Sequence, residues 1–99
     1  MIEIAHFNHK AEYCDFISDM WITYDGETKT VIWKISDNSS EEPSIHTKTY
    51  KTEYGAYNRF LLSIAQAIRG AWPLVEWKAG DYAVIPAKEV EQITSPGLL

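Results

Sequence analysis

Cysteine, arginine and long apolar runs are all scarce in this 99-residue chain. A single cysteine, Cys14, leaves no internal disulfide to form and fits a reducing compartment. Only Arg59 and Arg69 are arginines, and acids outnumber basic residues by fourteen to nine, which argues against direct binding of nucleic acid. No apolar run reaches the roughly 18 residues that span a bilayer, and the N-terminal residues lack a signal-peptide pattern. We therefore expect a cytoplasmic protein with no membrane partner.

The motifs that mark common catalytic and nucleotide-binding sites are also missing. The five glycines are scattered and form neither a dinucleotide-binding pattern nor a P-loop. The chain has no Gly-x-Ser-x-Gly elbow, no HExxH pair and no EF-hand loop. We therefore expect no enzyme activity and no cofactor.

Histidine and cysteine supply the one alternative that involves metal or covalent chemistry. The residues of zinc-ligand type are His6, His9, Cys14, Asp15 and His46. Their spacing matches no familiar zinc module, and His6 and His9 would face opposite sides of a continuous strand. The surroundings of Cys14 do not resemble an activated thiol either. The sequence therefore favours neither a metal site nor a nucleophile.

Apolar and aromatic residues are plentiful, at 45% and 13% of the chain. That proportion is ample for a packed core and argues against disorder. A chain of this length makes one domain, because single domains mostly have about 100–150 residues. We expect a single domain over residues 1–99, with residues 87–99 as a frayed C-terminal tail.

The negative charge is concentrated near the N-terminus. The formal net charge is −5, and residues 1–27 alone hold six acids against one base, Lys10. These acids are Glu3, Glu12, Asp15, Asp19, Asp25 and Glu27. One interpretation is a set of solvated acids that keeps the protein soluble. The other is an acidic surface that meets a basic partner and speeds association with it.

The segment from Tyr24 to Glu27 is the clearest local signal. Asp25-Gly26 between two β-rich runs favours a two-residue type I′ turn, because both central residues tolerate positive φ. Tyr24 then faces Glu27, and the pairing continues along both strands. One face of this hairpin belongs to the core, since alternate residues share a face. Its members are Phe16, Met20, Ile22, Val31, Trp33 and Ile35.

The opposite face of this hairpin is more apolar than a solvated sheet face normally is. Trp21, Ile17 and Ile32 form an apolar island on it. The charged residues around the island are Asp15, Asp19 and Lys34. Either another part of the chain covers the island, or the island is a binding patch with an aromatic anchor and a charged rim.

Residues 53–69 are predicted to form a helix. Apolar residues recur at helical spacing at Tyr57, Leu61, Ile64 and Ile68. Thr52 suits the N-cap, Gly70 suits the residue after the helix, and Pro73 prevents its continuation.

Strands are predicted around this helix. They comprise a first strand at 2–7, an edge strand at 45–50, and a second hairpin that pairs 74–77 with 82–85. The order predicts an α+β fold, with a single antiparallel β-sheet of about five or six strands and one long helix packed on one face. The other face of the sheet is then at least partly open.

These observations favour a non-catalytic, acidic protein that binds another protein. The hypothesis is a small inhibitor that blocks a basic nucleic-acid-handling protein by occupying its basic surface. Phage-encoded inhibitors of host defence, of the anti-CRISPR and anti-restriction kinds, and nuclease immunity proteins share this size, acidity and lack of catalytic motifs. That likeness is one of kind and not of sequence. The residues expected to bind the partner are Asp15, Asp19, Trp21, Asp25, Glu27 and Ile32.

A self-associating structural or accessory module is the alternative. Such a module would form a homodimer through the face that carries Trp21 or through the edge strand at 45–50. Sedimentation of the wild type and of Trp21→Ala distinguishes the two hypotheses, because only the homodimer changes its mass when the interface is lost.

Overall fold

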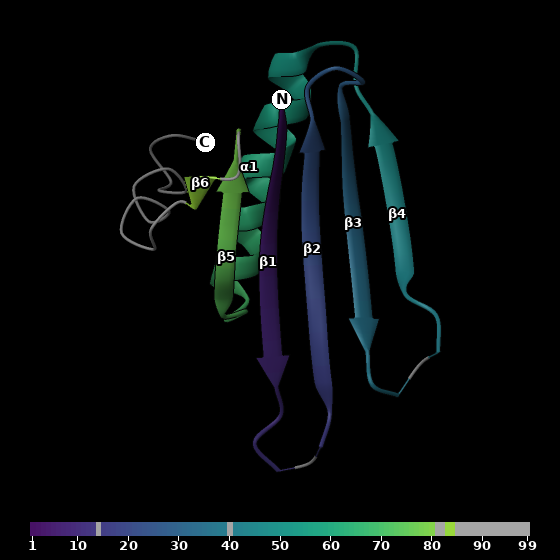
Figure 1. Cartoon of the computed structure of the whole chain (residues 1–99), viewed down its shortest axis with the longest axis vertical. Helices are drawn as coiled ribbons and strands as arrows, with labels where there is room; N and C mark the ends of the chain where they lie inside the picture. Colours follow the sequence, from purple (N-terminus) through teal and green to yellow (C-terminus); the bar gives the residue numbers. More distant parts are fainter. Residues whose placement is uncertain (14, 40, 81–82, 85–99) are drawn as a thin grey trace.

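The computed structural model describes residues 1–13, 15–39, 41–80 and 83–84. Figure 1 shows one twisted sheet with a single helix behind it. In chain order the elements are β1 (Ile2–Lys10), β2 (Ile17–Asp25), β3 (Thr30–Asp37), β4 (Ser44–Thr49), α1 (Glu53–Arg69), β5 (Leu74–Ala79) and β6 (Ala83–Val84). The predicted α+β fold, an antiparallel sheet with one helix packed on it, is confirmed.

The sheet has the strand order β4-β3-β2-β1-β5-β6, and every neighbouring pair is antiparallel. β1 to β4 follow one another as a meander. α1 then runs back along the sheet, and β5 pairs with the free side of β1 (Figure 1). The first strand of the chain therefore lies inside the sheet, between β2 and β5.

α1 has the bounds that the sequence predicts, Glu53–Arg69. The hydroxyl of Thr52 accepts a hydrogen bond from the amide of Gly55 at 3.0 Å, which caps the first turn. At the other end, the amide of Gly70 donates to the carbonyl of Gln66 at 2.9 Å. A helix of 17 residues is about 25 Å long, enough to cross several strands.

The core lies between α1 and the face of the sheet that α1 covers, which we call the inner face. Its largest fully buried side chains are Trp77, Phe7, Phe60, Ile22, Ile64 and Val31. Burial of each such side chain contributes about 1.5–3 kcal/mol to stability. The indole Nε1 of Trp33 also donates to Oγ of Ser63 at 3.0 Å, which joins β3 to α1.

The predicted two-residue turn at Asp25-Gly26 is wrong. Asp25 pairs with Thr30, so a loop of residues 26–29 joins β2 to β3. The carboxylate of Asp25 accepts from the amide of Glu27 at 3.0 Å, and Lys29 takes the positive φ of 56°. These two features close a loop of four residues in place of the predicted two. Each residue of β2 therefore pairs with a residue of β3 four positions later than predicted, so that Tyr24 faces Val31 and not Glu27.

Because that shift is an even number of residues, most side chains keep their predicted face. Met20, Ile22 and Val31 are buried, as predicted. Phe16 and Ile35 are not core residues, since they are 38% and 40% exposed. Phe16 directly precedes β2 and Ile35 lies near the end of β3, where these strands extend past α1 (Figure 1).

β4 lies at an edge of the sheet with all its residues exposed, as predicted. β5 pairs with β6 as a second hairpin, but the predicted pairing of 74–77 is wrong, because β5 continues to Ala79 and its paired residues are Lys78 with Val84 and Ala79 with Ala83. β1 is longer than predicted and continues to Lys10. Cys14 and the predicted tail at 87–99 lie outside the described residues. No helix in the described part of the chain is long and apolar enough to cross a membrane.

Candidate protein-binding face

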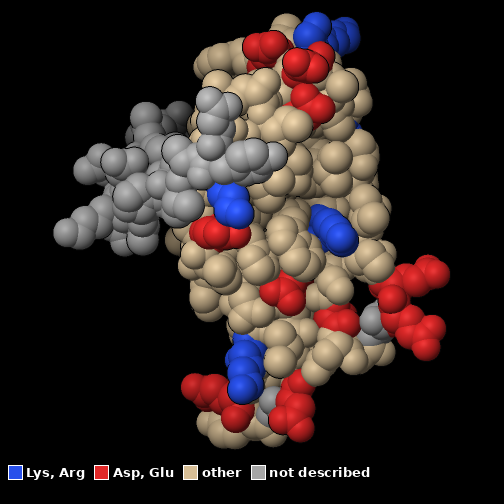
Figure 2. Space-filling view, in the orientation of Figure 1, with Lys and Arg blue, Asp and Glu red and all other residues tan. Residues whose placement is uncertain are grey.

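The face of the sheet opposite α1, which we call the outer face, carries the candidate site. Every described element lies either in the sheet or on its other side, against the inner face (Figure 1). Figure 2 looks onto the outer face, where charged side chains of both signs are spread singly across the middle and acids gather at the top and bottom ends. Side chains reach this face from alternate positions of each strand.

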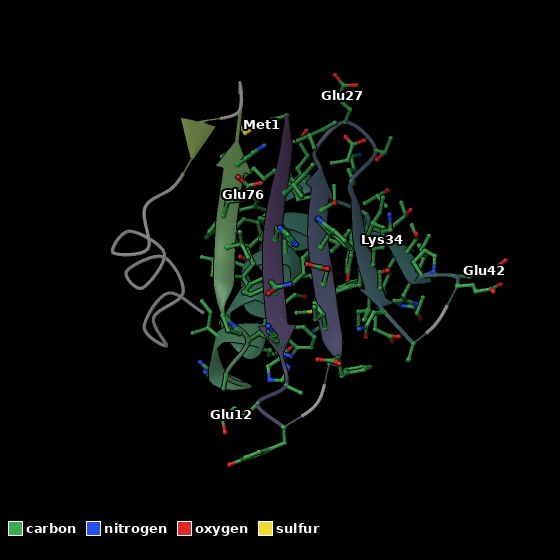
Figure 3. The ribbon with its side chains drawn as sticks, turned by 60° about the horizontal axis from the view of Figure 1, so that its bottom comes forward. Met1, Glu12, Glu27, Lys34, Glu42 and Glu76 are labelled. Atoms are coloured by element: carbon green, nitrogen blue, oxygen red, sulfur yellow. The ribbon has the colours of Figure 1, made fainter. Side chains whose placement is uncertain are left out.

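The middle of the outer face is a row of side chains that crosses five strands. The register aligns Glu76, His6, Trp21, Lys34 and Ile45, from β5 to β4. Figure 3 labels Glu76 and Lys34, which lie on either side of the row's centre. Trp21 occupies that centre, so its ring has a cross-strand neighbour on both sides.

Both neighbours contact the Trp21 ring. The imidazole of His6 stacks on it, with ring centroids 4.8 Å apart and planes inclined by 3°. On the other side, Nζ of Lys34 lies 5.2 Å from the ring centroid of Trp21. Such contacts contribute about 0.5–1.5 kcal/mol for the aromatic pair and about 0.5–1 kcal/mol for an exposed cation–π pair. The indole is therefore held in one orientation at the surface.

Asp19 lies beside this row and is held by two donors from β1. Its Oδ1 accepts from Nε2 of His6 at 2.8 Å and from Nδ2 of Asn8 at 3.0 Å. The hydrogen bond from Asn8, followed by the one from His6, lowers the pKa of Asp19 below its ordinary value. The carboxylate is therefore charged at neutral pH. His6 orients both Asp19 and Trp21.

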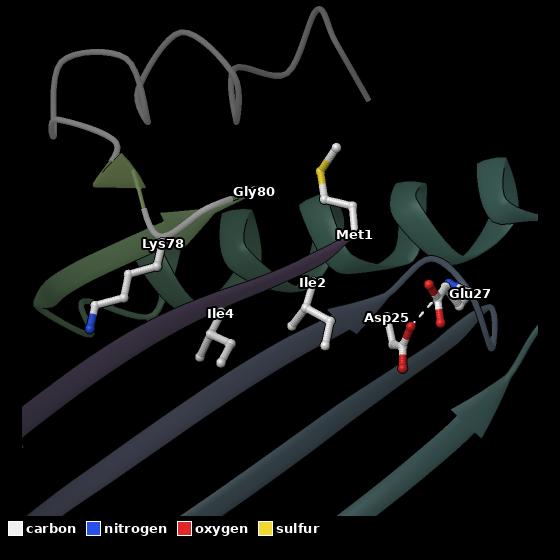
Figure 4. A pocket seen from close by; sticks show the side chains of 7 residues that line it. All are labelled: Met1, Ile2, Ile4, Asp25, Glu27, Lys78 and Gly80. Carbon is white, nitrogen blue, oxygen red and sulfur yellow. Dashed lines mark hydrogen bonds between the residues drawn. The ribbon is translucent and has the colours of Figure 1, made fainter.

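A cavity of about 660 Å³ opens on the outer face at the end where β1 begins. Ile2 and Ile4 from β1 form its apolar floor (Figure 4). Asp25 and Glu27 line one side, and Lys78 lies on the other (Figure 4). The cavity thus combines an apolar floor with two carboxylates on one side and an ammonium on the other.

Comparison with protein-family models, with curated proteins and with solved structures finds no match. A fold of this class hosts many unrelated functions, so the fold by itself names none. The argument about function therefore rests on the side chains of the outer face.

The structure divides the predicted binding residues into three places. Asp19, Trp21 and Ile32 lie together in the middle of the outer face. Ile32 is on β3 and pairs with Thr23, which follows Trp21 on the same face of β2. Asp25 and Glu27 lie at one end, beside the cavity.

Asp15 belongs to the loop that joins β1 to β2, at the opposite end of the sheet. Its backbone carbonyl accepts a hydrogen bond from the side chain of Asn38. β2 alone spans about 30 Å, so Asp15 is far from the loop at 26–29. Figure 3 shows the same separation between Glu12 and Glu27. The acids of residues 1–27 thus do not form one acidic surface. They divide between the two ends of the sheet, apart from Asp19 in the middle of the outer face and Glu3 in the core.

Sequence reasoning missed the contribution of β1 to this face. Ile2, Ile4 and Asn8 lie on the outer face with His6, because residues at every second position share it. That alternation was visible in the sequence. The pairing of His6 with Trp21 was not, since it depends on how β1 aligns with β2.

The histidines lie apart from one another. His6 is on the outer face, whereas the ring of His9 lies 5.8 Å from that of Trp72 and the ring of His46 lies 5.3 Å from that of Trp33. Among the residues that the structure describes, no three histidine, cysteine, aspartate or glutamate side chains are grouped as metal ligands. The outer face thus combines an oriented aromatic ring, fixed charges and an apolar cavity, an arrangement suited to binding.

Proposed function

We propose that this protein is a non-catalytic, acidic protein that binds a basic protein partner through its outer face. The observation that carries the proposal is the Trp21 ring, held between His6 and Lys34 on the face that α1 leaves free. Tryptophan is enriched among the residues that dominate binding energy at interfaces. A ring that is already oriented loses little conformational entropy when a partner covers it.

The charges around Trp21 favour a basic partner. Asp19 supplies a fixed negative charge next to the ring, and Asp25 and Glu27 supply two more at the outer cavity. The whole chain has a formal net charge of −5, so long-range attraction also favours a positive surface. Such complementarity raises the association rate and selects the partner more than it adds affinity.

A nucleic-acid-handling protein is the partner class that this chemistry fits best. Such proteins carry clustered lysines and arginines where they bind phosphates, and an acidic protein can occupy that surface. The binding then inhibits the partner, as the anti-CRISPR, anti-restriction and nuclease-immunity kinds of protein inhibit theirs. This mode of action requires no catalytic group from the inhibitor.

Affinity capture with matched variants tests the proposal. The wild-type chain, Trp21→Ala and Tyr54→Ala are each immobilised and exposed to an extract of the native cell. Tyr54 is the control because it is an exposed aromatic residue on α1, 77% accessible. We expect one basic protein to be retained by the wild type and by Tyr54→Ala, and its affinity for Trp21→Ala to be about 30-fold lower. Equal retention by Trp21→Ala contradicts the proposal.

Association kinetics with the captured protein test the electrostatic part. Reversal of Asp25 and Glu27 to lysine should slow association and weaken its dependence on salt. Reversal of Glu41 and Glu42, which precede β4, changes the net charge by the same amount away from the outer cavity and serves as the control. If both pairs of substitutions alter the association rate equally, net charge alone acts and the outer cavity has no special role.

Self-association is the second candidate function, and β4 favours it. All residues of β4 are exposed, Ile45 is 60% accessible, and an edge strand presents unpaired backbone groups to another strand. In sedimentation at micromolar concentration this function predicts a dimer. A monomer at that concentration leaves the binding of a different protein as the function.

A further inference from the structure

A second cavity, of about 460 Å³, lies on the other side of β1, between the inner face and the first two turns of α1. Glu3 on β1 pairs with Tyr24 on β2 and with Ala79 on β5, so these three residues form one row across the sheet. This row is one wall of the cavity. Glu53 and Tyr57, one helical turn apart on α1, form the opposite wall. We call it the Glu3 cavity.

Glu3 is an acid in the core, only 4% exposed. Its Oε1 accepts from the hydroxyl of Tyr57 at 3.2 Å and from the indole Nε1 of Trp77 at 3.1 Å. Among the described residues, no lysine, arginine or histidine side chain forms an ion pair with Glu3. The positive charge that acts on Glu3 is the amino group of Met1, which also lines the cavity. Glu3 and Glu53 both line the cavity, so its two carboxylates outnumber the single Met1 ammonium and favour a further positive charge.

The walls of the Glu3 cavity suit a flat cation. The rings of Tyr24 and Tyr57 meet edge to face, with centroids 4.9 Å apart and planes inclined by 70°. Burial, followed by the charge of Glu3, raises the pKa of Tyr57 well above its ordinary value, so the hydroxyl keeps the proton that it donates to Glu3. Glu53, at the exposed start of α1, adds a second carboxylate at the rim.

An anion is disfavoured at the same place, although the start of a helix attracts anions. Thr52 already accepts hydrogen bonds from two amides of the first turn, those of Gly55 and Ala56. The carboxylates of Glu3 and Glu53 also repel negative charge.

We propose that the Glu3 cavity binds a guanidinium group, such as the side chain of an arginine. A guanidinium stacks on aromatic rings and presents a planar fork of donors to carboxylates, whereas an ammonium does neither. Met1 borders both this cavity and the one on the outer face, but Glu3, Tyr57 and Glu53 line this cavity alone. The proposal does not depend on the partner proposed for the outer face.

A titration with small probes tests this proposal. The probe is N-acetyl-L-arginine methylamide, and the control is the citrulline analogue, which has nearly the same shape but no charge. The reporter is the NMR signal of the Trp77 indole Nε1–H, which donates to Glu3. We expect a saturable shift of this signal with the arginine probe and none with the citrulline probe. Equal shifts with both probes, or no shift with either, overturn the proposal.

Matched variants locate the binding. Glu3→Gln keeps an oxygen that accepts from Tyr57 and Trp77 but removes the charge, so the arginine probe should bind about 10-fold more weakly. Glu53→Gln, at an exposed position, should weaken binding about 2-fold and remains informative if Glu3→Gln does not fold. Asp19→Asn removes a carboxylate from the outer face and should leave probe affinity unchanged. If Glu53→Gln and Asp19→Asn have equal effects, the probe responds to net charge and the proposal fails.

Free L-arginine distinguishes two sources of the guanidinium. Free L-arginine carries an α-ammonium and an α-carboxylate, whereas both groups are blocked in N-acetyl-L-arginine methylamide. Affinity about 10-fold higher for free arginine indicates a small-molecule ligand. Equal affinity indicates an arginine within a polypeptide.

Discussion

At the scale of single residues, Glu3 is the side chain whose environment differs most from what its type prefers. Acids are almost never fully buried unless they are paired. Glu3 is buried with two hydrogen-bond donors and no cationic side chain. Burial, the largest influence, raises its pKa above the ordinary value of 4.5. The titratable groups that share its cavity are Tyr24, Tyr57, Glu53 and the Met1 amino group.

This raised pKa makes stability depend on pH. Because the folded state holds the Glu3 proton more tightly than the unfolded state, its stabilising contribution is complete below pH 4.5 and is lost as pH rises through the folded pKa. Glu3→Gln should therefore be more stable than the wild type at pH 7, and the difference should shrink as pH falls towards 4.5. Urea unfolding at a series of pH values measures it. A variant less stable than the wild type at neutral pH contradicts this account.

At the scale of elements, the loop at 26–29 contains a non-glycine residue in the left-handed region. Lys29 has a φ of 56°, a conformation that glycine adopts without steric cost. Lys29→Gly should raise the free energy of unfolding by about 0.5–1 kcal/mol. Lys29→Ala removes the same charge but keeps the Cβ, so it should give no such gain. Chemical denaturation of both variants compares the two effects, and equal stability of the two rules out a backbone origin.

The cap of α1 is the second feature of an element that can be tested. Thr52→Ala should lower the free energy of unfolding by about 1 kcal/mol, because the Gly55 amide loses its acceptor. Thr52→Ser keeps the acceptor and should cost much less. Thermal unfolding followed by circular dichroism measures both variants. A serine variant as unstable as the alanine variant would indicate that the methyl group of Thr52 matters more than the cap.

Some elements were predictable from the sequence and others were not. The difference is whether an element is defined by neighbouring residues or by contacts with residues far away in the sequence. α1 was predictable because its cap, its apolar stripe and Gly70 are all local signals. The loop at 26–29 was not, because the Asp25 side chain and the positive φ at Lys29 together outweigh the Asp-Gly signal. The outer face was only half predictable: the alternation in β2 placed Asp19 and Trp21 on one face, but their contacts come from β1. The burial of Glu3 left no local signal.

At the scale of the whole molecule, Phe60 joins α1 to both halves of the sheet. Its ring lies 5.8 Å from that of Tyr24 on β2 and 5.7 Å from that of Trp77 on β5. Phe60→Ala should cost about 3–5 kcal/mol, a large part of the 5–15 kcal/mol that typical domains have. Tyr54→Ala, on the exposed side of α1, should cost less than about 0.5 kcal/mol. Unfolding in guanidinium chloride compares the stabilities of Phe60→Ala and Tyr54→Ala. Similar unfolding midpoints for the two variants would refute the packing of α1 described above.

The position of β1 inside the sheet has a consequence for how the protein folds during synthesis. β1 is made before the other described elements, but one of its two neighbours, β5, is made after α1. The hydrogen bond between Trp77 and Glu3 joins residues 74 positions apart. Until then one side of β1 has no partner strand, and a fold with such distant contacts forms slowly compared with a helical bundle. Both cavities are lined from β1 and β5 together, by Ile4 with Lys78 and by Glu3 with Ala79. A nascent chain on the ribosome therefore has neither cavity complete, and we expect the proposed partner and the proposed guanidinium ligand to bind only after β5 has joined the sheet.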